Sequence, residues 1–426
     1  MVKPMLRPAF VLVHRFVGLT IAAFLFVSGV TGAVISWDHE LDELINPHLV
    51  EAPGRGPLLD PLVLADKIAA EDPQSFVTYV PLHPEEGHSL DFGVEPRYDT
   101  ETQALYETGY NQVFVDPVTG ETRGKREWGA AWPISTETFV SFLYVLHYSL
   151  HIPEMWGIDR WGEWLMGGVA LLWTIDCFVG FYLTLPIRKR TTAKIGSWWS
   201  RWKPAWKIKT GGSAYRINFD LHRAFSLWTW LLLFVLAVSA VSLNLYAEVA
   251  RPIVAALSSF TPTPYDTRPL LPHSALLEPK VTYAQVLANG RAEAERRGFT
   301  APAGDIFYSP DYGVFGVRFF LPGEEHGDGF QLNPDILYFD SADGRYIGDY
   351  IPWRGTAGDL FLQLQFPVHS GRILGIPGRI LISAMGLGVA MLSVTGVVIW
   401  LRKRRARLAV RRPAAVTQQR NMISAE

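Results

Sequence analysis

The chain contains one cysteine in 426 residues, Cys177. A single thiol excludes an intramolecular disulfide, a CxxC redox pair, and Cys-ligated iron–sulfur or c-type haem sites. Nucleotide-binding and zinc-binding motifs are also missing: there is no G-x-G-x-x-G before a helix, no P-loop and no zinc signature. A nicotinamide or flavin domain is thus missing from the sequence, so electrons for any redox reaction must come from elsewhere.

Acidic residues are absent between Arg188 and Lys209, where eight Lys and Arg occur. The segment 402–412, RKRRARLAVRR, is similarly basic, whereas 37–138 holds 20 acidic and 6 basic residues. Because basic segments next to membrane spans stay in the cytoplasm, this asymmetry predicts cytoplasmic termini and long acidic regions on the outer side.

Apolar residues make up 49% of the chain, which also has 15 tryptophans, so we expect a protein that is part membrane-embedded and part globular. Four apolar runs are long enough to cross a bilayer as helices. The predicted spans are 10–36, 161–185, 218–246 and 376–401. The first is interpreted as an uncleaved anchor, because it is too long for a signal peptide and has no clear A-x-A site. Two shorter apolar segments, 139–153 and 358–371, predict interfacial or re-entrant helices.

Two long segments on the outer side, 37–138 and 247–357, each combine one helical pattern with several strand patterns. Both contain a similar hairpin, VFVDPVTGETRG and LYFDSADGRYIG, in which Asp116 aligns with Asp340 and a glycine follows four residues later. The chain is therefore predicted to have duplicated halves, each with a span, an outer α+β module, a short helix and a second span.

The inner segments carry tryptophan and positive charge. In the basic loop 186–217, four tryptophans alternate with Arg and Lys, which predicts an amphipathic segment lying on membrane lipid. Nucleic-acid binding is the weaker interpretation and is not expected. The segment 402–426 is predicted to be a basic cytoplasmic tail.

Four histidines recur at equivalent places in the two halves: His14 with His222 near the inner ends, and His147 with His369 on the outer side. Ionisable groups in membrane spans are costly and usually functional. Since imidazole is a common iron ligand, two pairs at two depths predict two bis-histidine b-type haems that carry electrons across the membrane.

Other polar residues near these histidines have open roles. Arg15 and Arg223 follow the inner histidines and could pair with haem propionates. His151, four residues after His147 and expected on the same helix face, is an alternative or substrate-side ligand. Asp176 lies near the middle of the second predicted span, where an interior hydrogen bond and a proton route are equally compatible. A single histidine at a span end would more often form only an interfacial hydrogen bond.

The chain resembles the PepSY-associated transmembrane family, which includes inner-membrane siderophore reductases of Gram-negative bacteria. The resemblance covers nearly the whole chain and rests on HRFVGL at His14, NPHL at Asn46, VDPVTGE at Val115, LHYSLHIP at Leu146, LHRAFSLW at Leu221 and FPVHSGRILGIPGR at Phe366. It implies an α-helical membrane protein with four main transmembrane helices, short interfacial helices, and two periplasmic α+β PepSY-like modules.

By the same resemblance, His14, His222, His147 and His369 would hold two haem b groups. The protein would reduce a ferric siderophore or similar iron chelate at the periplasmic face of the bacterial inner membrane and release Fe(II). The electron donor would be a quinol or a cytoplasmic flavin reductase.

Two other functions compete with this interpretation. One is a haem-free protein whose outer modules bind peptide or regulate a protease, but it leaves the matched histidines unexplained. The other is a transporter of the iron chelate, which internal repeats favour. The predicted spans, however, lack evident Gly/Pro-broken helix pairs at mid-depth.

Overall fold

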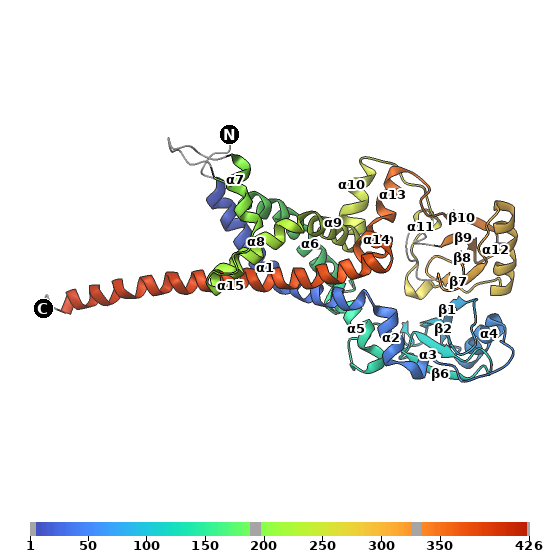
Figure 1. Ribbon diagram of the computed structural model, residues 1–426. Coiled ribbons are helices and arrows are strands. Elements are labelled where there is room, and N and C mark those ends of the chain that lie inside the picture. The colour runs from blue at the N-terminus through green and yellow to red at the C-terminus, as the bar shows by residue number, and fades with distance from the viewer. Residues whose placement is uncertain (1–5, 188–196, 325–333, 424–426) are drawn as a thin grey trace. The chain divides into compact units, whose positions relative to one another are not determined.

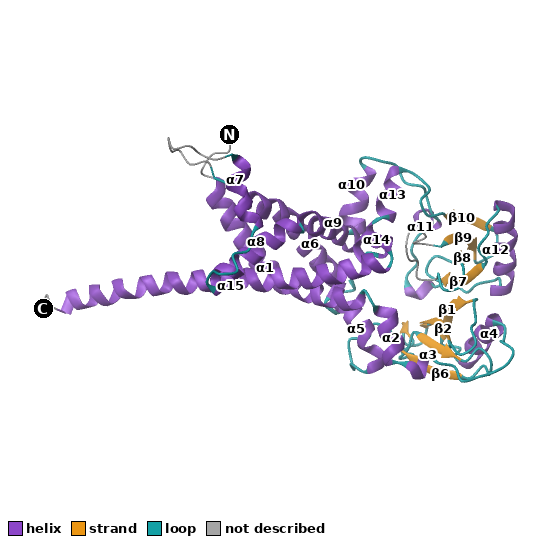
Figure 2. Ribbon diagram, in the orientation of Figure 1, coloured by secondary structure: helices purple, strands orange, loops and turns teal. Residues whose placement is uncertain are grey.

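The computed structural model of the protein describes residues 6–187, 197–324 and 334–423, with side chains up to residue 409 in the last segment (Figure 1). Residues 188–196 of the predicted basic loop lie outside this description. The chain divides into two compact units: residues 1–36, 146–250 and 380–426, and residues 37–145 and 251–379. The first is helical, and all strands belong to the second (Figure 2).

Within the described residues, three helices are long and apolar enough to cross a membrane: α1 (Leu6–Ile35), α6 (Trp161–Thr184) and residues Ile376–Ala409 of α15 (Ile376–Ile423). A bent pair, α8 (Ala214–Trp228) and α9 (Trp230–Asn244), brings the number to four if the pair counts as one span. The helix α15 continues to Ile423, so the segment predicted as a separate tail after residue 401 begins as part of this helix.

The third predicted span, 218–246, is not one straight helix, because α8 and α9 meet at an angle of 71° around Thr229. The Thr229 hydroxyl donates to the carbonyl four residues earlier (2.8 Å), an interaction that often bends helices. The indole of Trp228 donates to a carbonyl of the preceding loop, while that of Trp230 donates to the Cys177 carbonyl (2.9 Å). Side chains on the two sides of the break are thus held by different elements.

The strands of the second unit form one antiparallel sheet of eight strands, in the order β10-β9-β8-β7-β1-β2-β5-β6. Their bounds are β1 Ser75–Pro81, β2 Leu90–Pro96, β5 Gln112–Val115, β6 Thr122–Arg126, β7 Ala303–Ser309, β8 Val314–Phe319, β9 Asp335–Asp340 and β10 Tyr346–Tyr350. The sequence predicted two separate modules, but β1 and β7 pair through Tyr79 and Phe307 and join them. This pairing provides hydrogen-bond partners for backbone N–H and C=O groups that would be unpaired if β1 and β7 were edge strands of separate sheets.

One helix packs against each half of the sheet (Figure 1). The helix α4 (Pro61–Glu71) buries Leu64 and Ile68 with the inward residues of β1, β2 and β5, such as Phe92. The helix α12 (Tyr283–Arg297) covers β7, β8 and β9 in a second apolar cluster. Apolar residues alternate along β2 because only one face of this strand meets α4.

The two aligned hairpins form the same turn. In each, the glycine N–H donates to the aspartate carbonyl four residues earlier at 2.9 Å. Gly120 and Gly344 have φ values of +70° and +73°, a conformation that glycine adopts without strain.

Short elements complete the fold. The predicted outer helix 139–153 is α5 (Thr136–Ser149), whereas the segment 358–371 breaks at Leu364 into two helices. The remaining helices and strands are α2 Asp38–Ile45, α3 Pro47–Val50, α7 Trp198–Trp202, α10 Arg251–Ala255, α11 Pro264–Thr267, α13 Ala357–Gln363, α14 Gln365–Ser370, β3 Tyr98–Asp99 and β4 Ala104–Leu105.

Candidate functional site

Two predicted site histidines lie together in the helical unit. His14 comes from α1 and His222 from α8, and their ring centroids are 6.3 Å apart with an angle of 57° between the ring planes. Residues 208 positions apart in the sequence are thus brought side by side by helix packing.

The Nδ1 atom of each ring is held by a neighbouring helix. His14 Nδ1 lies 2.9 and 3.0 Å from the two carboxylate oxygens of Asp176 on α6. His222 Nδ1 lies 2.9 Å from the hydroxyl oxygen of Thr395 on α15. Four helices, α1, α6, α8 and α15, therefore meet at this pair.

These contacts decide which nitrogen of each ring can bind a ligand. An ionised carboxylate only accepts hydrogen bonds, so His14 donates from Nδ1. The Thr395 hydroxyl donates to the Met391 carbonyl (2.8 Å), and its oxygen is therefore the acceptor for His222 Nδ1–H. In both neutral rings the lone pair is then on Nε2, the arrangement found in metal-binding histidines.

The separation of the rings fits two ligands of a single metal. Imidazole nitrogens lie about 2.0–2.1 Å from a bound metal, so with about 1.1 Å from nitrogen to ring centre, two opposed imidazoles have centroids about 6.3 Å apart. That is the distance between His14 and His222. In the described parts of the chain, no group of three or more His, Cys, Asp or Glu could hold a metal ion. The pair thus suits a haem, whose porphyrin supplies the remaining ligands, better than a zinc site.

Glycines leave space beside both rings. A Cβ on Gly180, one turn after Asp176 on α6, would lie 3.6 Å from His14 Cε1. A Cβ on Gly396, next to Thr395 on α15, would lie 3.3 Å from His222 Cε1, closer than most real Cβ contacts. The helix α6 thus provides both a hydrogen-bond acceptor and an adjacent glycine for His14, and α15 provides both for His222.

His147 on α5 is held by α1 in a similar way. Its Nδ1 lies 3.0 Å from the Ser28 carbonyl oxygen and 3.2 Å from the Thr31 hydroxyl. A Cβ on Gly32 would come within 2.8 Å of His147 Cε1, so a larger residue would displace the ring. These contacts begin 14 residues after His14, about 21 Å further along α1. One helix therefore contributes to two histidine sites separated by much of the thickness of a bilayer core, about 30 Å.

The other predicted ligands have different positions. His369 lies on α14 in the second unit, and its pairing with His147 stays a prediction. His151 does not continue the α5 face, because the helix ends at Ser149 and both Leu150 and His151 have positive φ values, 57° and 52°. The expectation that His147 and His151 share a helix face is therefore wrong.

Arg15 and Arg223, the two predicted propionate partners, contact other groups of the chain. Arg15 stacks on the ring of Phe16, 4.6 Å from the guanidinium carbon. Arg223 donates to the buried Asp220 carboxylate (2.7 Å) and to the carbonyls of Pro204 (2.8 Å) and Ala205 (3.2 Å). In this structure Arg223 therefore fixes the tryptophan-rich inner loop.

Sequence reasoning missed several of these partners. Asp176 was expected to have an interior role. Thr395, Ser28 and Thr31 were missed, because serine and threonine are common in membrane helices, where their hydroxyls often donate to the backbone of their own helix. The available signal was a small polar residue close to a glycine within an apolar run, as in Thr395–Gly396 and Thr31–Gly32.

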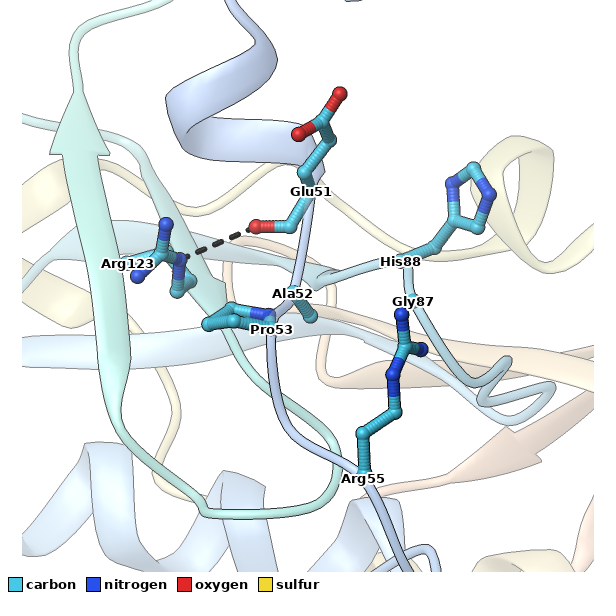
Figure 3. Close-up of a pocket in the computed structure, with 7 residues that line it drawn as sticks. All are labelled: Glu51, Ala52, Pro53, Arg55, Gly87, His88 and Arg123. Atoms are coloured by element: carbon cyan, nitrogen blue, oxygen red, sulfur yellow. Dashed lines mark hydrogen bonds between the residues drawn. The ribbon is translucent and has the colours of Figure 1, made fainter.

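The second unit contains a pocket of about 410 Å³, lined by Glu51, Ala52, Pro53, Arg55, Gly87, His88 and Arg123 (Figure 3). Its wall is held by a hydrogen bond from the Ala52 N–H to the Gly87 carbonyl. Arg123 donates to the Glu51 backbone carbonyl (3.2 Å), and Arg55 pairs with Glu86 (3.6 Å). The guanidinium groups could attract an anion, but exposed charges contribute little energy. The histidine pair is the stronger candidate site.

The family model of the PepSY-associated TM region matches residues 11–403, from the first turns of α1 to α15. Among curated proteins, none matches the chain.

Proposed function

Since the chain belongs to the PepSY-associated TM family, we propose that it is a di-haem b-type oxidoreductase of the bacterial inner membrane. It passes electrons from a donor at the cytoplasmic or membrane side to a ferric siderophore or similar iron chelate in the periplasm. The observation that carries this proposal is the His14–His222 pair, with a ring separation of 6.3 Å and with Nδ1 of each ring beside an oxygen of a neighbouring helix.

The residues of the chain have separate tasks in this proposal. His14 and His222 would hold one haem, and His147 and His369 the other. When bound, haem b accepts and gives one electron at a time. Thr395 and Asp176 orient the two rings of the inner pair, and α1 carries residues of both sites. Electrons then have a route along α1 from one side of the membrane to the other.

The proposed substrate follows from iron chemistry. Siderophores hold Fe(III) with hard oxygen donors, and Fe(II) binds these donors much less strongly. Transfer of one electron from the protein to the chelate therefore releases Fe(II) without breaking the organic ligand. Because the sequence has no nucleotide-binding motif, the donor is a quinol or a separate cytoplasmic flavin reductase.

The orientation rests on charge. The tryptophan-rich loop and the α15 extension are basic and face the cytoplasm, as do both termini, whereas the acidic sheet unit is periplasmic. Cysteine labelling of a C177A background tests this topology with membrane-impermeant reagents. A cysteine at position 66, on the exposed face of α4, should react from the periplasm, and one at position 207 only after lysis.

The first test is an optical spectrum of detergent-purified protein before and after dithionite, with haem counted per chain. We expect b-type bands and about two haems per chain, as two histidine pairs require. His222→Ala should remove about one haem, while His88→Ala, at the exposed pocket, should remove none. Reoxidation of the reduced protein by a ferric chelate then tests the reaction.

Two outcomes contradict the proposal. If wild-type protein made with adequate haem supply contains no haem, the chain is better described as a membrane-anchored PepSY binding or regulatory protein. If His222→Ala keeps the full haem content, the assigned ligands are wrong.

A further inference from the structure

The inner histidines have chemically different partners. His14 donates to a carboxylate, with Nδ1 within 3.0 Å of both oxygens of Asp176. His222 donates to a neutral hydroxyl, that of Thr395, and His147 contacts the neutral Ser28 carbonyl and Thr31 hydroxyl. The two rings of the inner pair thus differ in the charge of the group beside Nδ1.

Asp176 is poorly placed for a merely structural carboxylate. Its side chain is only 10% exposed and lies within an apolar helix. In the described parts of the chain, no lysine or arginine forms an ion pair with it, and its hydrogen bonds go to His14. A buried carboxylate is costly unless positive charge lies nearby. A metal cation bound to His14 Nε2 would provide that charge through the ring.

We propose that Asp176 is a positioning residue that lowers the reduction potential of the His14–His222 site. This inference rests on the proposed function. By accepting the Nδ1–H, the carboxylate increases the electron density that His14 donates through Nε2. More donation favours the ferric over the ferrous state of the bound iron.

The consequence is an inner site that gives up its electron more readily. The step is the gain of one electron, supplied by the quinol or flavin donor, and the proton remains on His14 Nδ1 throughout. Because the negative charge of Asp176 disfavours the reduced inner site, the electron passes to the acceptor more readily than it would with a neutral group beside His14.

The test is a redox-poised optical titration of the full-length protein in detergent. Asp176→Asn keeps the size of the side chain and an acceptor oxygen but removes the charge. We expect one of the two midpoint potentials to rise by at least about 59 mV, which for one electron is a tenfold change in the equilibrium constant of reduction. The other midpoint should not move. The matched variant Thr395→Val, which changes a neutral partner, should shift the inner midpoint less, and Asp176→Glu should stay near wild type.

A second measurement identifies the midpoint that belongs to this site. The midpoint missing from the titration of His222→Ala should be the one that rises in Asp176→Asn. The inference is overturned if the missing midpoint is the one that Asp176→Asn leaves unchanged, or if Asp176→Asn binds two haems at unchanged potentials. Either result leaves the di-haem proposal intact, whereas absence of haem from wild-type protein would defeat that proposal itself.

Discussion

Gly29 on α1 and Gly386 on α15 bring the backbones of these two helices into direct contact. A Cβ on Gly29 would lie 2.5 Å from the Gly386 carbonyl oxygen, and a Cβ on Gly386 would meet the Gly29 carbonyl in the same way. Close backbone approach at small residues is a common source of helix association in membranes. The contact fixes the helix that carries His14 against the helix that carries Thr395.

Substitution of Gly386 by Leu should therefore separate α1 from α15. We expect a loss of folded protein in detergent, measured by size-exclusion chromatography and thermal unfolding, because the new side chain collides with backbone. Gly18→Ala on α1 is the control, since no atom lies within 4 Å of a Cβ there, and it should be neutral or slightly stabilising. Equal behaviour of the two variants would show that the Gly29–Gly386 contact is unimportant.

Replacing Thr395 by Val should weaken the hold on the His222 ring. The variant removes the acceptor at 2.9 Å without changing side-chain size. We expect about 1 kcal/mol lower stability and, for bound haem, about 10–100-fold weaker binding. Haem retention during dilution measures the second effect. Thr174→Val is the control, because that hydroxyl donates to the Ala170 carbonyl of its own helix; a similar haem loss there would rule out a specific role for Thr395.

Asp91, on β2 in the sheet unit, should make stability depend on pH. Burial raises its pKa to about 7, with Arg126 opposing the shift and Asp42 adding to it. In the unfolded chain the pKa is about 3.9, so the folded state binds the extra proton and stability falls as pH rises from about 4 to 7. Asp91→Asn cannot ionise and should keep the hydrogen bond from Gln112.

The stabilisation of Asp91→Asn over wild type should thus grow across that pH range and then level off. Melting temperatures at pH 5, 6, 7 and 8 measure it, with Asp66→Asn on the exposed face of α4 as a control for the loss of a surface carboxylate. A difference for Asp91→Asn that does not change with pH would show that Asp91 is ionised throughout.

Local patterns in the sequence were sufficient for several elements. The apolar runs indicated α1, α6 and the membrane part of α15, because about 20 apolar residues in a row have few other stable environments. The Asp116 and Asp340 hairpins followed from a glycine at the position that needs a positive φ. The family resemblance was also correct over residues 11–403.

The interruptions of these patterns were harder to predict. The bend at Thr229 depends on which carbonyl its hydroxyl and the neighbouring indoles contact. The end of α5 before His151 depends on two non-glycine residues with positive φ, which have no clear sequence signal. The joining of two predicted modules into one sheet requires β1 to meet β7, more than 200 residues later.

By itself, the sequence determined which segments are apolar, which histidines recur in the two halves, and that a membrane protein of this family results. Only the tertiary structure decided that His14 faces His222, and that Asp176 and Thr395, 162 and 173 positions away from them, hold the two rings. The physical reason is that helix and strand periodicity is local, whereas the partner of a buried imidazole is chosen by the packing of helices distant in sequence.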